Sequence, residues 1–256
     1  MRKCVLIVLC LFLQMHRTAV GEGLQFTMKD IIKEKLEEMD VDSIKYLVLT
    51  HPHADHISGT RWLIDAYEVG TAILPPIEYG TEVFNKTIDA LRESEVDLIY
   101  PYPGDQFHLD DAVVTVYGPH PVAYTQENDW SIVLMIEYAG KKILLTGDAQ
   151  IEAEIDMLSC NDWLPLQADI LKVAHHGSNT SSSFEFIEAV SPQYAIISCG
   201  KNDEEYPHVE TAMTLMDCGV SDVITTEKVG DIHIRIYETG SYMISGQRME
   251  QFILVK

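Results

Sequence analysis

The sequence predicts a layered α/β fold with mixed β-sheets, and three observations lead to this prediction. Apolar runs of strand length alternate along the chain with segments whose apolar residues recur at helical spacing. Two pairs of neighbouring apolar runs are joined by short turns, which adds hairpins to strands that helices separate. No internal repeat or Pro/Gly/Ser-rich linker divides the chain. We therefore expect one domain over residues 24–256, preceded by a distinct segment at residues 1–21.

The first half of the domain alternates helices with short buried strands. Residues 28–39 carry apolar side chains at helical spacing, and residues 45–50 (KYLVLT) have the pattern of a buried strand. Pro75 follows a short strand and ends it. The expected helices are 28–39, 58–67 and 80–95, and the expected strands are 45–50, 71–74, 96–100 and 112–117.

The second half begins with a hairpin, because two largely apolar runs, 131–138 and 141–146, flank a short turn that contains Gly140. Strands and helices then alternate again, and a second hairpin over 231–237 and 241–245 follows them. The other expected helices are 150–158, 183–190 and 208–218, and the other expected strands are 169–174, 194–199 and 222–225. This order of elements favours a layered fold with mixed sheets.

The composition and net charge limit the classes of molecule that the protein can bind. The chain has 256 residues, of which 46% are hydrophobic and 23% charged, as in ordinary globular proteins. Its net charge is −22, from 18 Lys and Arg against 40 Asp and Glu. Such an acidic protein repels phosphate backbones, so we expect no tight general binding to nucleic acid. A small or anionic ester substrate remains compatible with this charge if local cations, such as bound metal, hold it. The oligomeric state stays open.

Residues 1–21 have the layout of a secretory signal peptide. A basic start precedes an apolar run over residues 4–13, and small residues follow near Gly21. The run is too short for a stable membrane span, which needs about 20 apolar residues. If this segment is cleaved, we expect a secreted or extracytoplasmic protein. The open alternative is a buried first strand in a cytoplasmic protein.

The strongest chemical signal is the segment His51-Pro52-His53-Ala54-Asp55-His56, directly after the strand over 45–50. Imidazoles and a carboxylate are ligands for zinc, iron or manganese. Alternation along the strand sends His51 and His53 to the same side, and Asp55 and His56 can turn toward a second metal where a helix begins. A surface histidine cluster is the alternative, and the position after a buried strand argues against it.

Two further polar segments follow strands in the same way. Gly147 lets the backbone approach closely, and the two oxygens of Asp148 can bridge two metals. His175 and His176 follow a later strand. We expect one of them to reach the metal and the other to bond a ligand or the substrate, and the spacing does not decide which. The hydroxyl-rich residues 178–181 suit an anion or a helix start.

Weaker candidates complete the set. His208 is either a site residue or the solvent-facing start of a helix. His120 lies in a turn-rich sequence, and we favour its interpretation as a loop residue over a site residue. Asn128 and Ser131 flank the start of a strand and either order the site or simply begin that strand.

The order and spacing of these motifs resemble the metallo-β-lactamase-fold hydrolases, with HPHADH at 51–56 as the signature. Within that superfamily the chain resembles the soluble relatives of the ComEC-type DNA-uptake proteins, over residues 28–245. The motifs that carry this resemblance are NDWSIVL at 128–134, LLTGDAQIEAE at 144–154, ADILKVAHHGSNTSS at 168–182, and IISCGKND at 196–203 with Pro207-His208.

The resemblance implies an αββα four-layer sandwich of two mixed β-sheets with a metal site at one edge. It implies one or two divalent metal ions, zinc or manganese, and we expect two, with zinc first and manganese as the alternative. The metal ligands it implies are His51, His53, Asp55, His56, Asp148 and His175. Asp55 would also accept a proton, and His176 or His208 would stabilise charge on the transferring oxygen or the leaving group.

The expected activity is hydrolysis of phosphoester, chiefly phosphodiester, or related ester bonds by metal-activated water. Two alternatives stay open, namely a ComEC-like nuclease acting on DNA and an inactive metal-binding fragment. The Gly-His-x-x-Gly-His histidine motif of lactamases is missing, and the segment 128–131 takes its place, which argues against β-lactam hydrolysis.

Two features depart from the ComEC branch. The first strands, with their Asp-Val-Gly-Gln-Gly-Asp and Ile-Asp-x-Gly motifs, are absent, so the chain is a truncated product or residues 4–13 serve as a strand. Glu205 and Tyr206 replace the Gly and one His that usually precede Pro207-His208. An acidic residue there disfavours a polyanionic substrate.

Overall fold

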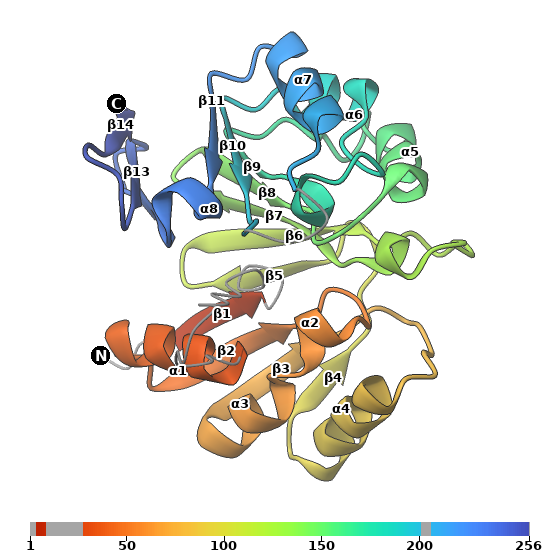
Figure 1. The fold of residues 1–256 in the computed structure, drawn as a ribbon. Coiled ribbons are helices and arrows are strands. Elements are labelled where there is room, and N and C mark those ends of the chain that lie inside the picture. The colour runs from red at the N-terminus through yellow and green to blue at the C-terminus, as the bar shows by residue number, and fades with distance from the viewer. Residues whose placement is uncertain (1–3, 9–27, 201–205, 256) are drawn as a thin grey trace, which may run out of the picture.

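The computed structural model describes residues 4–8, 28–200 and 206–255, and their strands form three β-sheets (Figure 1). The first sheet is parallel throughout, in the order β1 (Cys4–Val8), β2 (Ser43–Val48), β3 (Glu68–Ile73) and β4 (Asp97–Ile99). The second is mixed, in the order β11 (Asp222–Thr225), β10 (Tyr194–Ile197), β9 (Ile170–Lys172), β8 (Lys141–Leu145), β7 (Val133–Tyr138), β6 (Ala112–Gly118) and β5 (Gln106–Leu109). The third is antiparallel, in the order β12 (Ile232–Ile236), β13 (Tyr242–Gly246) and β14 (Ile253–Val255).

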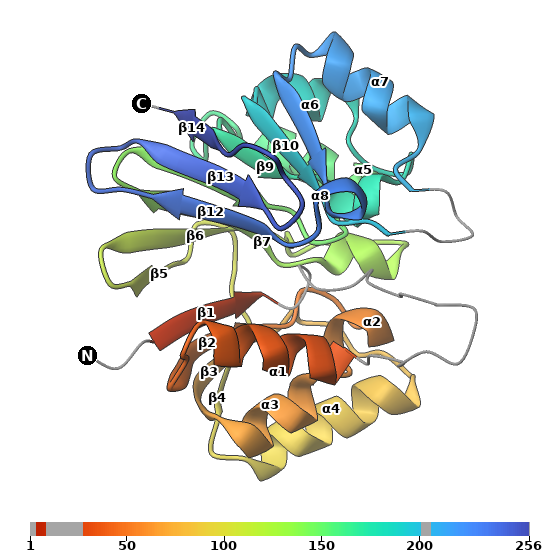
Figure 2. The ribbon, with the colours of Figure 1, turned by 60° about the vertical axis from the view of Figure 1, so that its left-hand side comes forward.

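Helices cover the outer faces of the first two sheets, as Figures 1 and 2 show from two sides. The first sheet carries α1 (Met28–Glu38), α3 (Thr60–Ala66) and α4 (Glu82–Glu93). The second sheet carries α5 (Ile151–Ser159), α6 (Phe184–Val190) and α7 (Val209–Asp217). The short helices are α2 (Ala54–Ile57), α8 (Thr226–Val229) and the 3-10 turns Glu127–Trp130 and Ala174–Gly177. The predicted α/β class with αββα layers is therefore confirmed, although of the two facing sheets only the second is mixed, since the described strands of the first are all parallel.

The strand β2 shows how one apolar run serves two layers of the core. Leu47 packs toward the helices of the first sheet, and Val48 packs between the two large sheets. Both side chains are fully buried, because successive residues of a strand point to opposite faces. Burying a side chain of this size stabilises the fold by about 1.5–3 kcal/mol relative to leaving it exposed. The end of β2 that is buried on both faces is therefore apolar at consecutive positions.

The inner face of the seven-stranded sheet is covered by two smaller sheets. The first sheet packs on the part formed by β6, β7 and β8, with Val48 and Ile73 against Val116 and Leu134. The third sheet packs on the part formed by β9, β10 and β11, where Tyr242 contributes to the apolar cluster. The C-terminal hairpin is thus part of the layered core.

Two strands are absent from the sequence prediction, β5 and β14. Both lie at a sheet edge, and their residues alternate between half-buried and exposed. Their sequences, QFHL and ILV, are too short for a periodic signal. The strand β3 also begins earlier than the predicted start at residue 71, at Glu68.

The N-terminal apolar run begins as the edge strand β1, which pairs in parallel with β2 from Cys4 opposite Ser43 to Val8 opposite Val48. Residues 9–21, most of the predicted signal peptide, lie outside the described residues, and so do Glu204 and Glu205. Cleavage of a leader therefore stays a prediction. Within the described ranges, every helix is too short or too polar to cross a membrane.

Candidate metal centre

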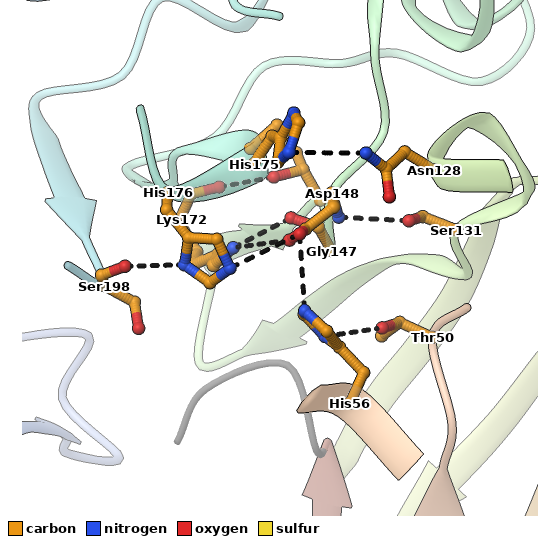
Figure 3. A network of polar contacts seen from close by, with 12 residues as sticks. Thr50, His56, Asn128, Ser131, Gly147, Asp148, Lys172, His175, His176 and Ser198 are labelled. Atoms are coloured by element: carbon orange, nitrogen blue, oxygen red, sulfur yellow. Dashed lines mark hydrogen bonds and ion pairs between the residues drawn. The ribbon is translucent and has the colours of Figure 1, made fainter. Parts of the chain in front are cut away.

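The polar segments that follow β2, β8 and β9 meet at one edge of the sandwich (Figure 3). The strands β8, β9 and β10 are parallel, so their carboxyl ends lie at the same edge of the second sheet. The loop after β2 reaches this edge from the first sheet, because the backbone NH of Ile132 donates to the carbonyl of Thr50 over 2.8 Å. The two sheets thus bring residues about 100 positions apart in sequence, such as His51 and Asp148, to one point.

Three imidazoles converge on one carboxylate oxygen. Oδ2 of Asp148 lies 3.3 Å from Nε2 of His56, 3.3 Å from Nε2 of His176 and 3.9 Å from Nε2 of His51. All four residues are at most 3% exposed. Asp55 lies on the solvent side of the cluster, with its Oδ2 3.5 Å from Nε2 of His56 and its side chain 48% exposed.

The unpaired atoms of this cluster fit a metal ion. Nε2 of His51, His56 and His176 are buried and have no hydrogen-bond partner within the described part of the chain. Leaving one such atom unsatisfied costs about 1–3 kcal/mol. Two overlapping groups, His51 with His56 and Asp148, and Asp55 with His56 and His176, have ligand atoms within 4.8 Å of one another. Imidazole nitrogens and carboxylate oxygens together are a donor set for a divalent transition metal.

The protonation states also suit metal binding. Burial lowers the pKa of His51 well below its ordinary value, and the neighbouring His56 lowers it further. Burial alone would raise the pKa of Asp148, but His56 and His176 outweigh it and hold this pKa well below the ordinary value. The cluster therefore contains a neutral imidazole and an ionised carboxylate, the forms in which these groups ligate metals.

Hydrogen bonds at the far side of each ring fix how the imidazoles point. Nδ1 of His176 donates to the carbonyl of Ser198 over 2.7 Å, which turns its Nε2 toward Asp148. Oγ1 of Thr50 lies 3.1 Å from Nδ1 of His51 and 3.4 Å from Nδ1 of His56. Both contacts leave the Nε2 atoms on the side of the carboxylate.

The turn that carries Asp148 requires a glycine. Gly147 has φ +55°, and a Cβ there would lie 3.0 Å from both Cβ and Oγ of Ser131. Oγ of Ser131 accepts from the backbone NH of Asp148 over 3.0 Å, and Nζ of Lys172 donates to the carbonyl of Gly147 over 2.8 Å. Ser131 therefore orders the site as well as standing at the start of a strand.

The two histidines of the third motif point to different places. His176 lies against Asp148, whereas His175, which we expected to ligate metal, lies outside this cluster. Nε2 of His175 is 3.3 Å from Nδ2 of Asn128, and its Nδ1 is 2.8 Å from Oγ1 of Thr180. Both histidines have positive φ, 45° and 56°, so the backbone turns sharply between them.

The other predicted residues lie around the cluster. The ring of His53 is 4.8 Å from that of His51 and 5.9 Å from that of Tyr79. Nδ1 of His208 accepts from the backbone NH of Asn179 over 3.0 Å. His120 is part of a different environment, in the loop that its sequence indicates, with its Nδ1 3.9 Å from Sγ of Cys160.

Sequence reasoning missed three residues of this site, Thr50, Lys172 and Ser198. Thr50 and Ser198 act through one hydroxyl and one carbonyl, which carry no sequence pattern. Lys172 had a signal, since it is the basic residue within the otherwise apolar segment ILKVA and is buried.

The four layers and the buried histidine–aspartate cluster at the sheet edge define an αββα protein with a metal-type centre. The sequence model of the metallo-beta-lactamase superfamily matches residues 20–201, and the chain belongs to this superfamily. The chain is similar to ComE operon protein 3 of Bacillus subtilis strain 168, with 32% identity over 196 residues, 76% of this chain and 25% of that protein. It is also similar to Recombination protein 2 of Haemophilus influenzae, with 27% identity over 196 residues, 76% of this chain and 23% of that protein.

The chain spans about a quarter of the length of these curated relatives. Their similarity confirms the resemblance to the ComEC-type branch. Among solved structures, CmlA, a diiron β-hydroxylase from Streptomyces venezuelae, matches with a TM-score of 0.51 and 12% identity, over 81% of this chain and 46% of that chain. At this identity the likeness is one of fold alone.

Proposed function

We propose that the chain is a metal-dependent hydrolase of phosphoester bonds, phosphodiesters first, or of related ester bonds. The observation that carries this proposal is the convergence of three buried Nε2 atoms, from His51, His56 and His176, on one oxygen of Asp148. Membership of the metallo-β-lactamase superfamily supports it.

The proposed ligands are His51, His53, Asp55, His56 and Asp148, with His176 as the member of the third motif that faces them. Together they would hold two divalent cations, zinc or manganese. Bound cations supply Lewis acidity and a water that ionises near neutral pH.

The exposure and hydrogen bonds of the individual side chains suggest their separate roles in the reaction. Asp148 is buried among imidazoles, where it stays ionised and holds its position. Asp55 is half-exposed beside His56, so it can hold a proton and pass it to solvent. Nδ1 of His208 accepts a backbone hydrogen bond, which leaves the ring proton on Nε2 as a donor to a leaving-group oxygen. His175 is anchored by Asn128 and Thr180 and would bind the substrate.

A nuclease acting on DNA is the second candidate. The resemblance to the ComEC-type DNA-uptake proteins favours it, and the similarity to ComE operon protein 3 and Recombination protein 2 supports that resemblance. The net charge of −22 disfavours it, since a long phosphate backbone would be repelled. Binding of single-stranded DNA that weakens steeply with added salt would support this candidate.

The test is a substrate screen on metal-loaded protein. Bis(p-nitrophenyl) phosphate, p-nitrophenyl phosphate, p-nitrophenyl acetate and single-stranded DNA would be assayed with Zn²⁺ and with Mn²⁺. We expect turnover of the phosphodiester that Asp148→Asn abolishes and that Asp65→Asn, an exposed residue paired with Arg61, leaves unchanged. Bound metal without turnover of any of these substrates would instead make the chain an inactive metal-binding protein.

A further inference from the structure

Lys172 is a buried cation that the proposed hydrolysis does not use. It is the last residue of β9, is 2% exposed, and lies on the same face of the strand as Ile170, toward the interior of the sandwich. Its Nζ donates to the carbonyl of Gly147 over 2.8 Å and lies 3.7 Å from Oδ1 of Asp148 (Figure 3). A buried ammonium is costly unless an opposite charge compensates it, so packing alone does not explain a lysine here.

The two oxygens of Asp148 face different groups. Oδ2 faces the Nε2 atoms of His51, His56 and His176, whereas Oδ1 faces the ammonium of Lys172. The carboxylate therefore has one oxygen on the metal side and one on the lysine side. Its orientation is fixed from both ends, since Lys172 also holds the carbonyl of the preceding residue.

We propose that Lys172 is the internal counter-ion of Asp148, which keeps the ligand cluster assembled before metal binds and weakens the affinity of the cluster for divalent cations. The inference rests on the proposed metal site. It makes Lys172 a positioning residue, because it acts through Asp148.

Two opposing effects follow from one charge. Without metal, Lys172 compensates the buried carboxylate, since a buried charge is costly unless an opposite charge lies close to it. A divalent cation held by the cluster would be repelled by the same ammonium, whose Nζ lies 3.7 Å from Oδ1 of Asp148. At an effective dielectric constant of about 20, a unit positive charge a few ångströms from a divalent cation weakens the binding of that cation by more than tenfold. A purely structural lysine would have the opposite effect on affinity, because its loss would disorder the ligands.

The test compares three variants of the full chain. Lys172→Met removes the charge and keeps the length of the side chain, and Lys172→Arg keeps the charge. Lys142→Met is the matched control, on the neighbouring strand β8 and paired with Glu137 at 3.8 Å. The measurements are the Zn²⁺ dissociation constant, by competition with a chromogenic chelator, and the melting temperature of the metal-free protein.

We expect Lys172→Met to bind Zn²⁺ at least tenfold more tightly than the wild type and to melt at a lower temperature without metal. Lys172→Arg and Lys142→Met should bind Zn²⁺ within about threefold of the wild type. Equal or weaker binding by a folded Lys172→Met variant would overturn the proposal. If the metal-free variant does not fold, the variant is refolded with Zn²⁺ and its rate of Zn²⁺ release is measured instead. Slower release than from the wild type would support the proposal. Equal or faster release would overturn it.

The outcomes separate this inference from the proposed function. A wild-type protein that binds neither Zn²⁺ nor Mn²⁺ would overturn both. A wild type that binds metal, with a Lys172→Met variant that binds no more tightly, would overturn the role of Lys172 alone. Tighter binding by the variant, with no hydrolysis by the wild type, would support the role of Lys172 and overturn the hydrolase.

Discussion

Asp148 and His176 follow neighbouring parallel strands, and Oδ2 of the carboxylate lies 3.3 Å from Nε2 of the imidazole. This contact joins the loops after β8 and β9 within one sheet. His56 reaches the same oxygen from the first sheet, also at 3.3 Å. The centre therefore depends on how the two sheets face each other as well as on the loops themselves.

Replacing Asp148 should remove the metal centre. In Asp148→Asn the carboxylate loses its charge while its size stays the same, so the cations lose the ligand that faces all three imidazoles. We expect metal affinity and activity to fall by at least about 100-fold. Replacing a residue that only orients a metal ligand can already cost up to that factor, and Asp148 is proposed as a ligand itself. Metal content by mass spectrometry checks this, with Asp65→Asn as the control. A variant that retains the full metal content would contradict the assignment of Asp148.

The two histidines of the third motif should separate in their effects. His176→Ala removes an imidazole that faces Asp148, so metal affinity should fall by about 100-fold. His175→Ala removes a ring held by Asn128 and Thr180, so metal content should remain and the Michaelis constant for the substrate should rise. Metal titration and steady-state kinetics on both variants test this pair. The reverse pattern would make His175 the ligand.

Gly147→Ala should destabilise the fold more than the same substitution at another glycine that also has a left-handed backbone conformation. The new Cβ would lie 3.0 Å from Ser131 at a φ of +55°. We expect a loss of about 2–4 kcal/mol from backbone strain and overpacking together. Gly140→Ala is the matched control, since its φ is +73° and no atom lies within 4 Å of the added Cβ, and it should cost about 1 kcal/mol. Urea unfolding measures both, and equal losses would argue against the close contact.

Glu154 should make the stability of the protein depend on pH. It is buried on α5, and it accepts backbone hydrogen bonds from Ser182 and Ser183, just before α6. Burial outweighs these bonds and raises its pKa. The folded state therefore favours the protonated form. This contribution to stability is fully present below the ordinary carboxyl pKa of 4.5 and is lost as the pH rises through the raised value.

The measurement is the melting temperature of the wild type and Glu154→Gln between pH 4.5 and 7.5, in chelator-treated buffer. The advantage of the wild type over Glu154→Gln should shrink as the pH rises. Glu152→Gln is the control on the same helix, because hydrogen bonds from Thr125 lower the pKa of Glu152 and reverse the direction. A constant difference between the wild type and Glu154→Gln over this range would refute the prediction.

The amino-acid sequence by itself determined most of the strands and the residue types at their ends, but not the edge strands β5 and β14. Residues 46–49 (YLVL) are apolar because this part of the chain packs on both faces, and the polar motifs that follow β2, β8 and β9 mark where these strands leave the core. Such patterns are local, since they reflect the period of a strand and the point at which it reaches solvent. They were enough to bring the segments of His51, Asp148 and His176 into one hypothesis.

Only the tertiary structure decided which atoms meet. The choice between His175 and His176 depends on the left-handed backbone at both residues, which their side-chain type does not reveal. The contact of Asn128 with His175, 47 residues away, and the placement of Lys172 against Asp148 depend on the order of strands in the sheet. That order is fixed by the packing of the whole chain, because a strand's own sequence determines which faces are buried but not which strand lies beside it.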